Sequence, residues 1–278
     1  DRPLRIYQKS VTEQFEDRWN YRNNDDSLKL FHVTSVSNNR PYGRGRVFHT
    51  PYNLRSKVST CRYSIAGYPS LYLGTSLDLC REEIHLNPHQ DFALASIFKL
   101  ERTVEYSSTN IQVIELGVKP QDFFNIEHYN ERHERRINNS LLENASVRTA
   151  YLLWYPLIAA CSYISVSKKD PFAAEYIIPQ LLMQWVRCEI GSQPGIEDEY
   201  SQLIGIRYFS CVSQKASETG FNYVFPTSGK QKSPDLPYCS VLAKSFYLSS
   251  PVYVHEFDIS MNVNSILEKK GDFDLIGS

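Results

Sequence analysis

Residues 62–83 read RYSIAGYPSLYLGTSLDLCREE, and this stretch says more about the chain than any other. Arg62 opens the stretch, Tyr72 follows ten residues later, and Glu83 stands eleven residues beyond Tyr72. A guanidinium, an aromatic ring and a carboxylate are a minimal set of groups for holding a phosphate-bearing nucleotide. The stretch therefore indicates a nucleotide site.

Local patterns predict where these three side chains lie. The alternation of residues 70–74 around Tyr72 predicts a short strand that ends at Gly74. Ser76 and the residue before it predict a helix N-cap, and the apolar spacing that follows is helical. Arg62 is therefore expected on a loop, Tyr72 on a strand and Glu83 about two turns into a helix.

The composition is that of an ordinary globular protein. The chain has 278 residues, of which 42% are hydrophobic and 22% are charged, which is enough for one large domain with insertions. The formal net charge of −1 argues against a general nucleic-acid binder, which is normally strongly basic.

A local excess of positive charge stands out against this balance. No Asp or Glu occurs between Ser27 and Leu77. A solvated basic face would explain such a window, but interleaved Gly and Pro residues predict a loop whose backbone can approach a ligand. We therefore favour anion binding. The cations of the window are Lys29, Arg40, Arg44, Arg46, Arg55, Lys57 and Arg62.

Targeting signals and metal patterns are missing from the sequence. No apolar run is long enough to span a membrane, and residues 1–5 lack the apolar region of a signal peptide, so we expect a cytoplasmic protein that does not bind membranes. The six cysteines are scattered singly, without a C-x-x-C pair or a close His. We expect them to be reduced, mostly buried, and not to bind a metal.

The pattern along the chain predicts an α+β protein. Strands are expected near 30–33, within 93–126, at 205–210, at 221–226 and within 245–260, and helices over 140–164 and from Asp170-Pro171 onward. Residues 1–27 are expected to form an N-terminal arm, 28–260 the catalytic domain, and 261–278 a loosely held tail.

Common catalytic motifs are missing as well. The sequence has no G-x-S-x-G elbow, no H-E-x-x-H, no G-x-G-x-x-G opening a helix and no complete P-loop. Its seven histidines are dispersed. The absence of these motifs argues against a hydrolase triad, a zincin, a dinucleotide-binding fold and an NTPase.

The remaining constellation resembles a known family. Its matching positions are Arg62, Gly67, Pro69, Tyr72 and Glu83, then Gly205-Ile206-Arg207-Tyr208 with Ser210, and finally Asn222 and Phe225. In these positions the chain resembles the RES domain family, named for an Arg, a Glu and a Ser, over roughly 30–86 and 175–226. Residues 90–170 look like an enlarged middle section.

The resemblance implies both a fold and an activity. Its members include bacterial toxins that degrade NAD+, and their fold is similar to that of ADP-ribosyltransferase toxins, with a mixed or antiparallel β core and flanking helices. It implies Arg62, Tyr72, Glu83 and Ser210 as catalytic residues and Asn222 as a substrate contact. NAD+ is then the substrate, inorganic phosphate a possible co-substrate, and no further cofactor is implied.

One departure from the family pattern concerns the anion contacts. Many compact members have an arginine just after the first strand, where this chain has His32-Val33. Arg44 and Arg46 are the expected replacements as substrate-binding residues.

The chemistry of NAD+ cleavage suits these side chains. Its transition state is an oxocarbenium-like ribose cation, and nicotinamide leaves as a neutral molecule, so a single carboxylate can suffice. Glu83 is expected to stabilise that cation, Arg62 to hold the pyrophosphate, Tyr72 to stack on nicotinamide or bond ribose, and Ser210 to bond ribose or the carboxamide. The structural alternatives are an Arg62–Glu83 salt bridge, a core tyrosine and a turn serine.

The attacking group is left open by the sequence. Water gives a glycohydrolase, phosphate a phosphorylase that forms ADP-ribose 1″-phosphate, and a protein side chain an ADP-ribosyltransferase. The resemblance favours the first two, and spare cations such as Arg44, Arg46 and Arg55 mildly favour phosphate. A toxin or antiviral effector would fit such an activity and would require a neutralising partner such as an antitoxin. A non-catalytic nucleotide-sensing module on the same fold is the alternative from another class.

Overall fold

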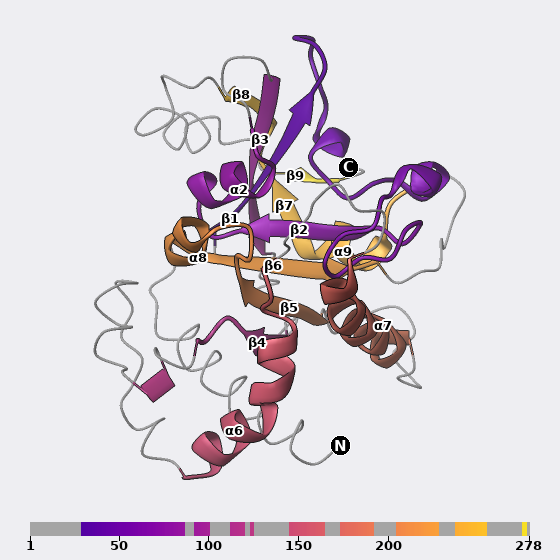
Figure 1. Cartoon of the computed structure of the whole chain (residues 1–278). Helices are drawn as coiled ribbons and strands as arrows, with labels where there is room; N and C mark the ends of the chain where they lie inside the picture. The colour runs from indigo at the N-terminus through magenta and orange to yellow at the C-terminus, as the bar shows by residue number, and fades with distance from the viewer. Residues whose placement is uncertain are drawn as a thin grey trace, which may run out of the picture.

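The computed structural model describes residues 29–86, 92–100, 112–119, 123–124, 145–164, 173–191, 204–227, 237–254 and 274–276. The expected N-terminal arm lies outside these residues. The described strands form one mixed sheet in the order β4-β5-β6-β2-β1-β3-β7-β9, with β8 paired to β3 (Figure 1). The strands are β1 (Lys29–Val36), β2 (Ser70–Gly74), β3 (Phe92–Leu100), β4 (Gln112–Leu116), β5 (Ile204–Phe209), β6 (Phe221–Pro226), β7 (Phe246–Leu248), β8 (Val252–Val254) and β9 (Asp274–Leu275).

Helices connect and cover these strands, which confirms the expected α+β class. The pairing of β4 with β5 is parallel, and the other described pairings are antiparallel. The helices are α2 (Leu77–Glu83), α6 (Ala145–Ala160), α7 (Ile177–Gly191), α8 (Gln214–Thr219) and α9 (Ser240–Ser245), with 3-10 turns η1 (Arg44–Arg46), η2 (Tyr52–Lys57) and η3 (Ala174–Tyr176).

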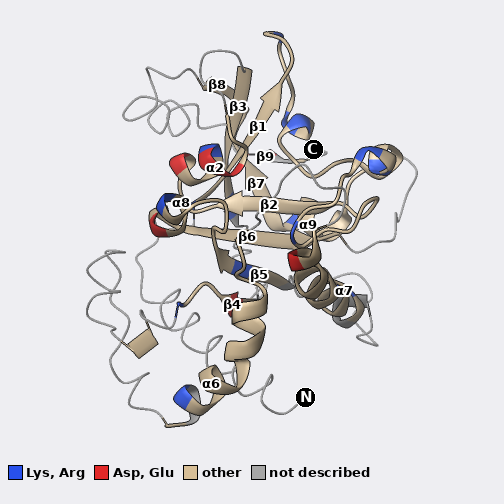
Figure 2. Ribbon diagram, viewed as in Figure 1, with Lys and Arg blue, Asp and Glu red and all other residues tan. Residues whose placement is uncertain are grey.

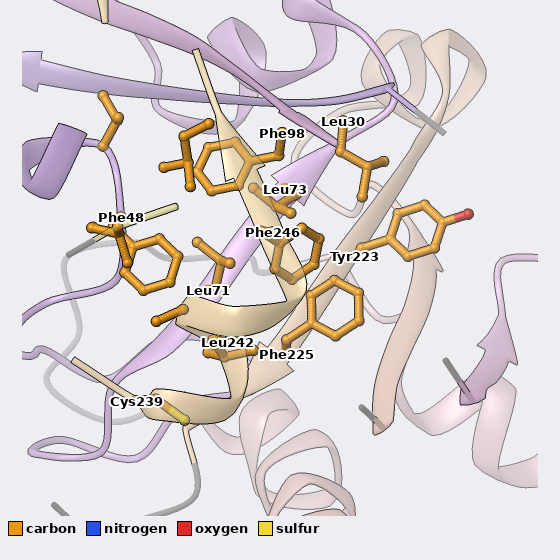
Figure 3. Packing of buried hydrophobic residues seen from close by; sticks show 14 of the residues in the cluster. Leu30, Phe48, Leu71, Leu73, Phe98, Tyr223, Phe225, Cys239, Leu242 and Phe246 are labelled. Atoms are coloured by element: carbon orange, nitrogen blue, oxygen red, sulfur yellow. The ribbon is translucent and has the colours of Figure 1, made fainter. Parts of the chain in front are cut away.

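One face of the sheet packs a core rich in Phe and Leu. Leu71 and Leu73 of β2 alternate with Tyr72, so both leucines point to this face, where Tyr223 and Phe225 of β6 join them. Figure 3 shows these side chains meeting Phe246, Leu242 and Phe98 from other elements. We call this packing the first core.

The opposite face packs against α6 and α7. Tyr151, Trp154 and Ile158 of α6 and Met183 and Val186 of α7 are buried against β4, β5 and β6. Figure 1 shows both helices at the β4–β5 end of the sheet. We call this packing the second core, and the site residues of β2, β5 and β6 border it.

The far end of the sheet differs from expectation in one respect. Residues 261–278 were expected to be loosely held, but within them β9 pairs with β7 and Ile276 is buried in the first core. The described end of this segment is therefore anchored to the sheet.

No helix within the described ranges is both long and apolar enough to cross a membrane. In the same part of the chain, no group of three or more His, Cys, Asp or Glu side chains could hold a metal ion. The six cysteines are free thiols, and all of them except Cys61 and Cys188 are buried.

Candidate functional site

Three neighbouring strands bring the predicted residues to one face of the sheet. In the register of β2 with β6, Tyr72 lies opposite Val224 and Gly74 opposite Asn222. In the register of β5 with β6, Tyr208 also lies opposite Asn222. Cross-strand partners share a face, so Tyr72, Asn222 and Tyr208 all stand on the side of the second core.

Glu83 reaches this face from α2. The helix begins directly after β2, where the Ser76 side chain accepts a hydrogen bond from the backbone N–H of Leu79 at 3.2 Å, as the N-cap prediction requires. At the other end of α2, Asn222 Nδ2 donates to Glu83 Oε1 at 2.5 Å. Glu83 is half-buried, and its carboxylate is held by the Asn222 amide.

The neighbouring carboxylate has a different environment. Glu82 pairs with Lys215 Nζ at 3.0 Å, and the lysine side chain is largely exposed. Of the two adjacent glutamates, Glu83 is the one that faces Asn222. Glu83 is therefore the glutamate of this pair that lies on the face of Tyr72 and Asn222.

Tyr72 is fixed at both its hydroxyl and its backbone. Its phenol shares a 2.7 Å hydrogen bond with Ser64 Oγ. His32 Nδ1–H donates to the Tyr72 carbonyl at 2.7 Å. Burial raises the pKa of the Tyr72 phenol and lowers that of His32, so both groups are neutral near pH 7. Neither Ser64 nor His32 was picked out as a contact of Tyr72 from the sequence.

Arg62 lies between the ends of two helical elements. Its Nη1 donates to the Cys161 carbonyl, just after α6, at 3.3 Å, and its guanidinium lies 5.2 Å from the ring centre of Tyr176 in η3. Within the described residues, Arg62 and Glu83 do not form an ion pair with each other. The structural salt bridge weighed from the sequence is therefore not present there.

The Cys161 carbonyl connects Arg62 with the end of β5. Arg62 Nη1 donates to this carbonyl at 3.3 Å, and Cys211 Sγ lies 4.0 Å from it. Burial raises the pKa of the Cys211 thiol to about 11, and the charges of Arg62 and Glu83 shift it in opposite directions.

Ser210 lies at that same strand end, but its hydroxyl has a local role. The residue is buried, and its Oγ accepts a hydrogen bond from the backbone N–H of Val212 at 3.2 Å. This bond is typical of a serine turn. The fold brings Ser210 to the site through its neighbour Cys211, while its oxygen is occupied by the backbone.

The structure gives Arg44 and Arg46 partners within the protein. Arg44 Nε donates to the Leu248 carbonyl at 3.0 Å, and its Nη1 lies 3.9 Å from Asp274 Oδ2. Arg46 Nη2 donates to the Ser35 carbonyl at 2.9 Å. Figure 2 shows basic residues on the short 3-10 turns at the upper right, whereas acidic residues lie on α2. The described contacts of Arg44 and Arg46 therefore serve the β1, β7 and β9 side of the sheet, not Glu83.

Lys119 is a cation near the site that the sequence did not single out. Its Nζ donates to Ser217 Oγ at 2.8 Å and lies 5.1 Å from the ring centre of Phe209. Its position after β4 depends on the parallel pairing of β4 with β5, which local sequence patterns do not reveal.

Comparison with known proteins gives one relative. The chain is 30% identical, in an alignment of 237 residues that covers 82% of the chain, to a protein of Bacillus subtilis (strain 168) named "Putative toxin YopC". The match covers 48% of YopC, so the chain spans about half the length of that protein. No family model matches the sequence, and no solved structure matches the chain.

Proposed function

We propose that this protein is an enzyme that degrades NAD+ by cleaving the bond between nicotinamide and ribose. The observation that carries the proposal is the position of Glu83, whose carboxylate is held by the Asn222 amide. Tyr72 stands on the same sheet face as Asn222, and Arg62 bonds the Cys161 carbonyl, which lies beside Cys211 at the end of β5. These are the residues of the RES resemblance, gathered from a loop, two strands and a helix.

The reaction mainly requires the protein to hold a charged group in the right position. The bond from ribose to the pyridinium nitrogen breaks, and its electron pair leaves with nicotinamide as a neutral molecule. A water or phosphate oxygen then bonds to the ribose carbon, and water would lose its proton to solvent. A fixed carboxylate stabilises the positive charge that develops on ribose, as in glycoside hydrolysis.

The other side chains supply binding and orientation. Arg62 offers N–H groups to the pyrophosphate, because its guanidinium has no carboxylate partner among the described residues. The neutral Tyr72 phenol, oriented by Ser64, can bond a ribose hydroxyl or stack on nicotinamide. Asn222 fixes the Glu83 carboxylate, and Ser210 supports the chain turn beside it.

A toxin role is supported by the printed name of the relative. YopC is named as a toxin, and the matched region covers most of this chain. Loss of NAD+ arrests a cell, so an enzyme of this kind needs a neutralising partner until it acts.

The acceptor is water or phosphate in this proposal. Arg44, Arg46 and Arg55 are the cations that favour phosphate in the sequence, but Arg44 and Arg46 donate to backbone carbonyls within the protein. An assay of products with and without phosphate therefore decides between ADP-ribose and ADP-ribose 1″-phosphate.

The deciding experiment incubates purified protein with NAD+ and resolves the products by mass. Glu83→Gln keeps the size of the side chain and removes its charge, so turnover should fall about 10²- to 10³-fold. Glu82→Gln is the matched control, because Glu82 contacts the exposed Lys215 instead of Asn222. Intact NAD+ with wild-type protein, or equal loss of activity in the two variants, would refute the proposal.

A further inference from the structure

One face of α7 runs along the loop that carries Arg62. Gln180, Gln184 and Arg187 are spaced four and three residues apart, so they lie on the same side of the helix. Gln180 Nε2 donates to the Cys61 carbonyl at 3.0 Å. Two turns further along the helix, Arg187 Nη2 donates to the Pro69 carbonyl at 2.8 Å.

The same face of α7 holds buried hydrogen-bond donors that have no acceptor among the described residues. These atoms are Gln184 Nε2 and the Nε and Nη1 atoms of Arg187. Buried polar atoms are normally paired, because an unpaired one has lost its hydrogen bonds to water and gained none from the protein. All the unpaired atoms on this face are nitrogens that carry hydrogen, so the missing partner is an acceptor.

Arg187 also brings a positive charge to this face, where hydrogen-bond acceptors are missing. Burial lowers the pKa of its guanidinium, and within the described residues no carboxylate pairs with it. Its guanidinium carbon lies 5.0 Å from the ring centre of Tyr68, and Nη2 also donates to Ser70 Oγ at 3.2 Å. A buried cation that lacks a counter-charge is costly, and a bound anion would remove that cost.

The position of Arg187 links it to the candidate site. Residues two apart on a strand point to the same face of the sheet, so Ser70 and Tyr72 of β2 share a face. Arg187 bonds the first residue of β2, and Tyr72 lies two residues further along that strand. An anion on this face of α7 would therefore lie beside the residues assigned to NAD+.

We propose that Gln184 and Arg187 form a binding site for the phosphate group of a ligand. Phosphate suits the site because its several oxygens can accept from a guanidinium and an amide at the same time. The proposal that an anion binds here does not depend on NAD+ cleavage. Its assignment to the diphosphate of a dinucleotide, or to free phosphate as co-substrate, rests on the proposed function.

The test is equilibrium binding by calorimetry, with ADP-ribose and inorganic phosphate as separate probes. Gln184→Leu is the main variant, because its Nε2 is buried without an acceptor, so the change removes no hydrogen bond among the described residues. Arg187→Lys keeps the charge but loses the planar set of donors. Gln180→Leu is the matched control on the same face, since the Gln180 amide is already bonded to a carbonyl.

We expect Gln184→Leu to weaken binding about 3- to 10-fold and Arg187→Lys about 10-fold or more, with a change below about 2-fold for Gln180→Leu. If the variants weaken the binding of ADP-ribose but not of phosphate, the site holds the diphosphate of the dinucleotide. If they weaken only the binding of phosphate, the site holds the co-substrate. Binding without NAD+ cleavage would refute the proposed function and leave this site standing. Failure of wild-type protein to bind either probe, or unchanged binding by Gln184→Leu, would overturn the site.

Discussion

At the scale of single residues, the contact between Glu83 and Asn222 is the part of the site most open to test. Asn222→Asp keeps the side-chain shape and replaces the donor nitrogen with an acceptor. In this variant the new carboxylate at position 222 faces the carboxylate of Glu83. Because two like charges repel at this distance, one of the two carboxylates takes up a proton. We expect NAD+ turnover at pH 7 to fall about 10-fold or more, with the fold retained by circular dichroism.

Asn53→Asp provides a matched control for this change, because Asn53 is exposed on η2. It makes the same chemical substitution away from Glu83 and should leave turnover unchanged. Full activity in Asn222→Asp would mean that Glu83 does not need its amide donor, and the assignment of Asn222 would fail.

His49 makes the stability of the fold depend on pH. It is buried, its Nδ1–H donates to the Thr50 carbonyl at 2.8 Å, and its Nε2 accepts from the Cys239 N–H at 2.9 Å. Burial lowers the pKa of His49 to about 4 from 6.5. The unfolded chain therefore takes up this proton more readily, so the contribution is complete above pH 6.5 and is lost as the pH falls toward 4.

Between pH 7.5 and pH 5, His49 should reduce the free energy of unfolding by about 2 kcal/mol. Urea unfolding of wild-type protein and of His49→Gln at the two pH values measures this difference. The variant should lose that much less stability on acidification. Equal pH dependence in both proteins would show that His49 is not buried as a neutral ring.

At the scale of elements, Gly205 allows β5 and β6 to pack without a clash. A Cβ at this position would lie 2.5 Å from Cε1 of the Phe225 ring. Gly205→Ala should therefore destabilise the protein by about 1–3 kcal/mol, measured as a lower urea midpoint with an unchanged slope. Gly43→Ala is the control, because nothing lies within 4 Å of its added Cβ, and it should cost little.

The elements around the site were largely predictable because their signals are local. The alternation in 70–74, the Ser76 cap and the spacing after it predicted β2 and α2, and both exist as expected. Pairing was harder to predict. The pattern predicts strands within 93–126 but not their partners: β3 joins β1 and β7, while β4 joins β5 at an edge of the sheet. Alternation indicates that a strand exists, but its partner depends on distant residues.

The same limit applies to cations in the site. The acid-free window drew attention to Arg44 and Arg46, whose described contacts are with carbonyls on another side of the sheet. Arg187 lies outside that window, on α7. The sequence of this helix does not reveal which of its polar side chains the fold buries. Net charge along a sequence reports local composition, whereas a binding site depends on which charges the fold buries without a partner.

At the scale of the whole molecule, one buried ion pair ties the β4 edge to the sheet. Arg207 of β5 lies opposite Glu115 of β4, and their side chains form a salt bridge with both almost fully buried. Glu115 Oε1 also accepts from the Gly117 N–H at 2.6 Å, and the Arg207 guanidinium lies 3.7 Å from the ring centre of Phe221. The pair therefore connects β4, β5 and β6, and β4 in turn leads to Lys119 beside the site.

Removing one member of this pair should be costly, because the other charge would stay buried without its partner. We expect Arg207→Met to lower the free energy of unfolding by about 3–5 kcal/mol. Arg207→Met combined with Glu115→Leu should cost less than Arg207→Met alone, since no charge is then left behind. Urea unfolding measures both variants, and hydrogen exchange should show faster opening in β4 than in β1 and β3. A small effect of Arg207→Met, or an additive double variant, would mean that hydrophobic packing of the second core holds β4 without the ion pair.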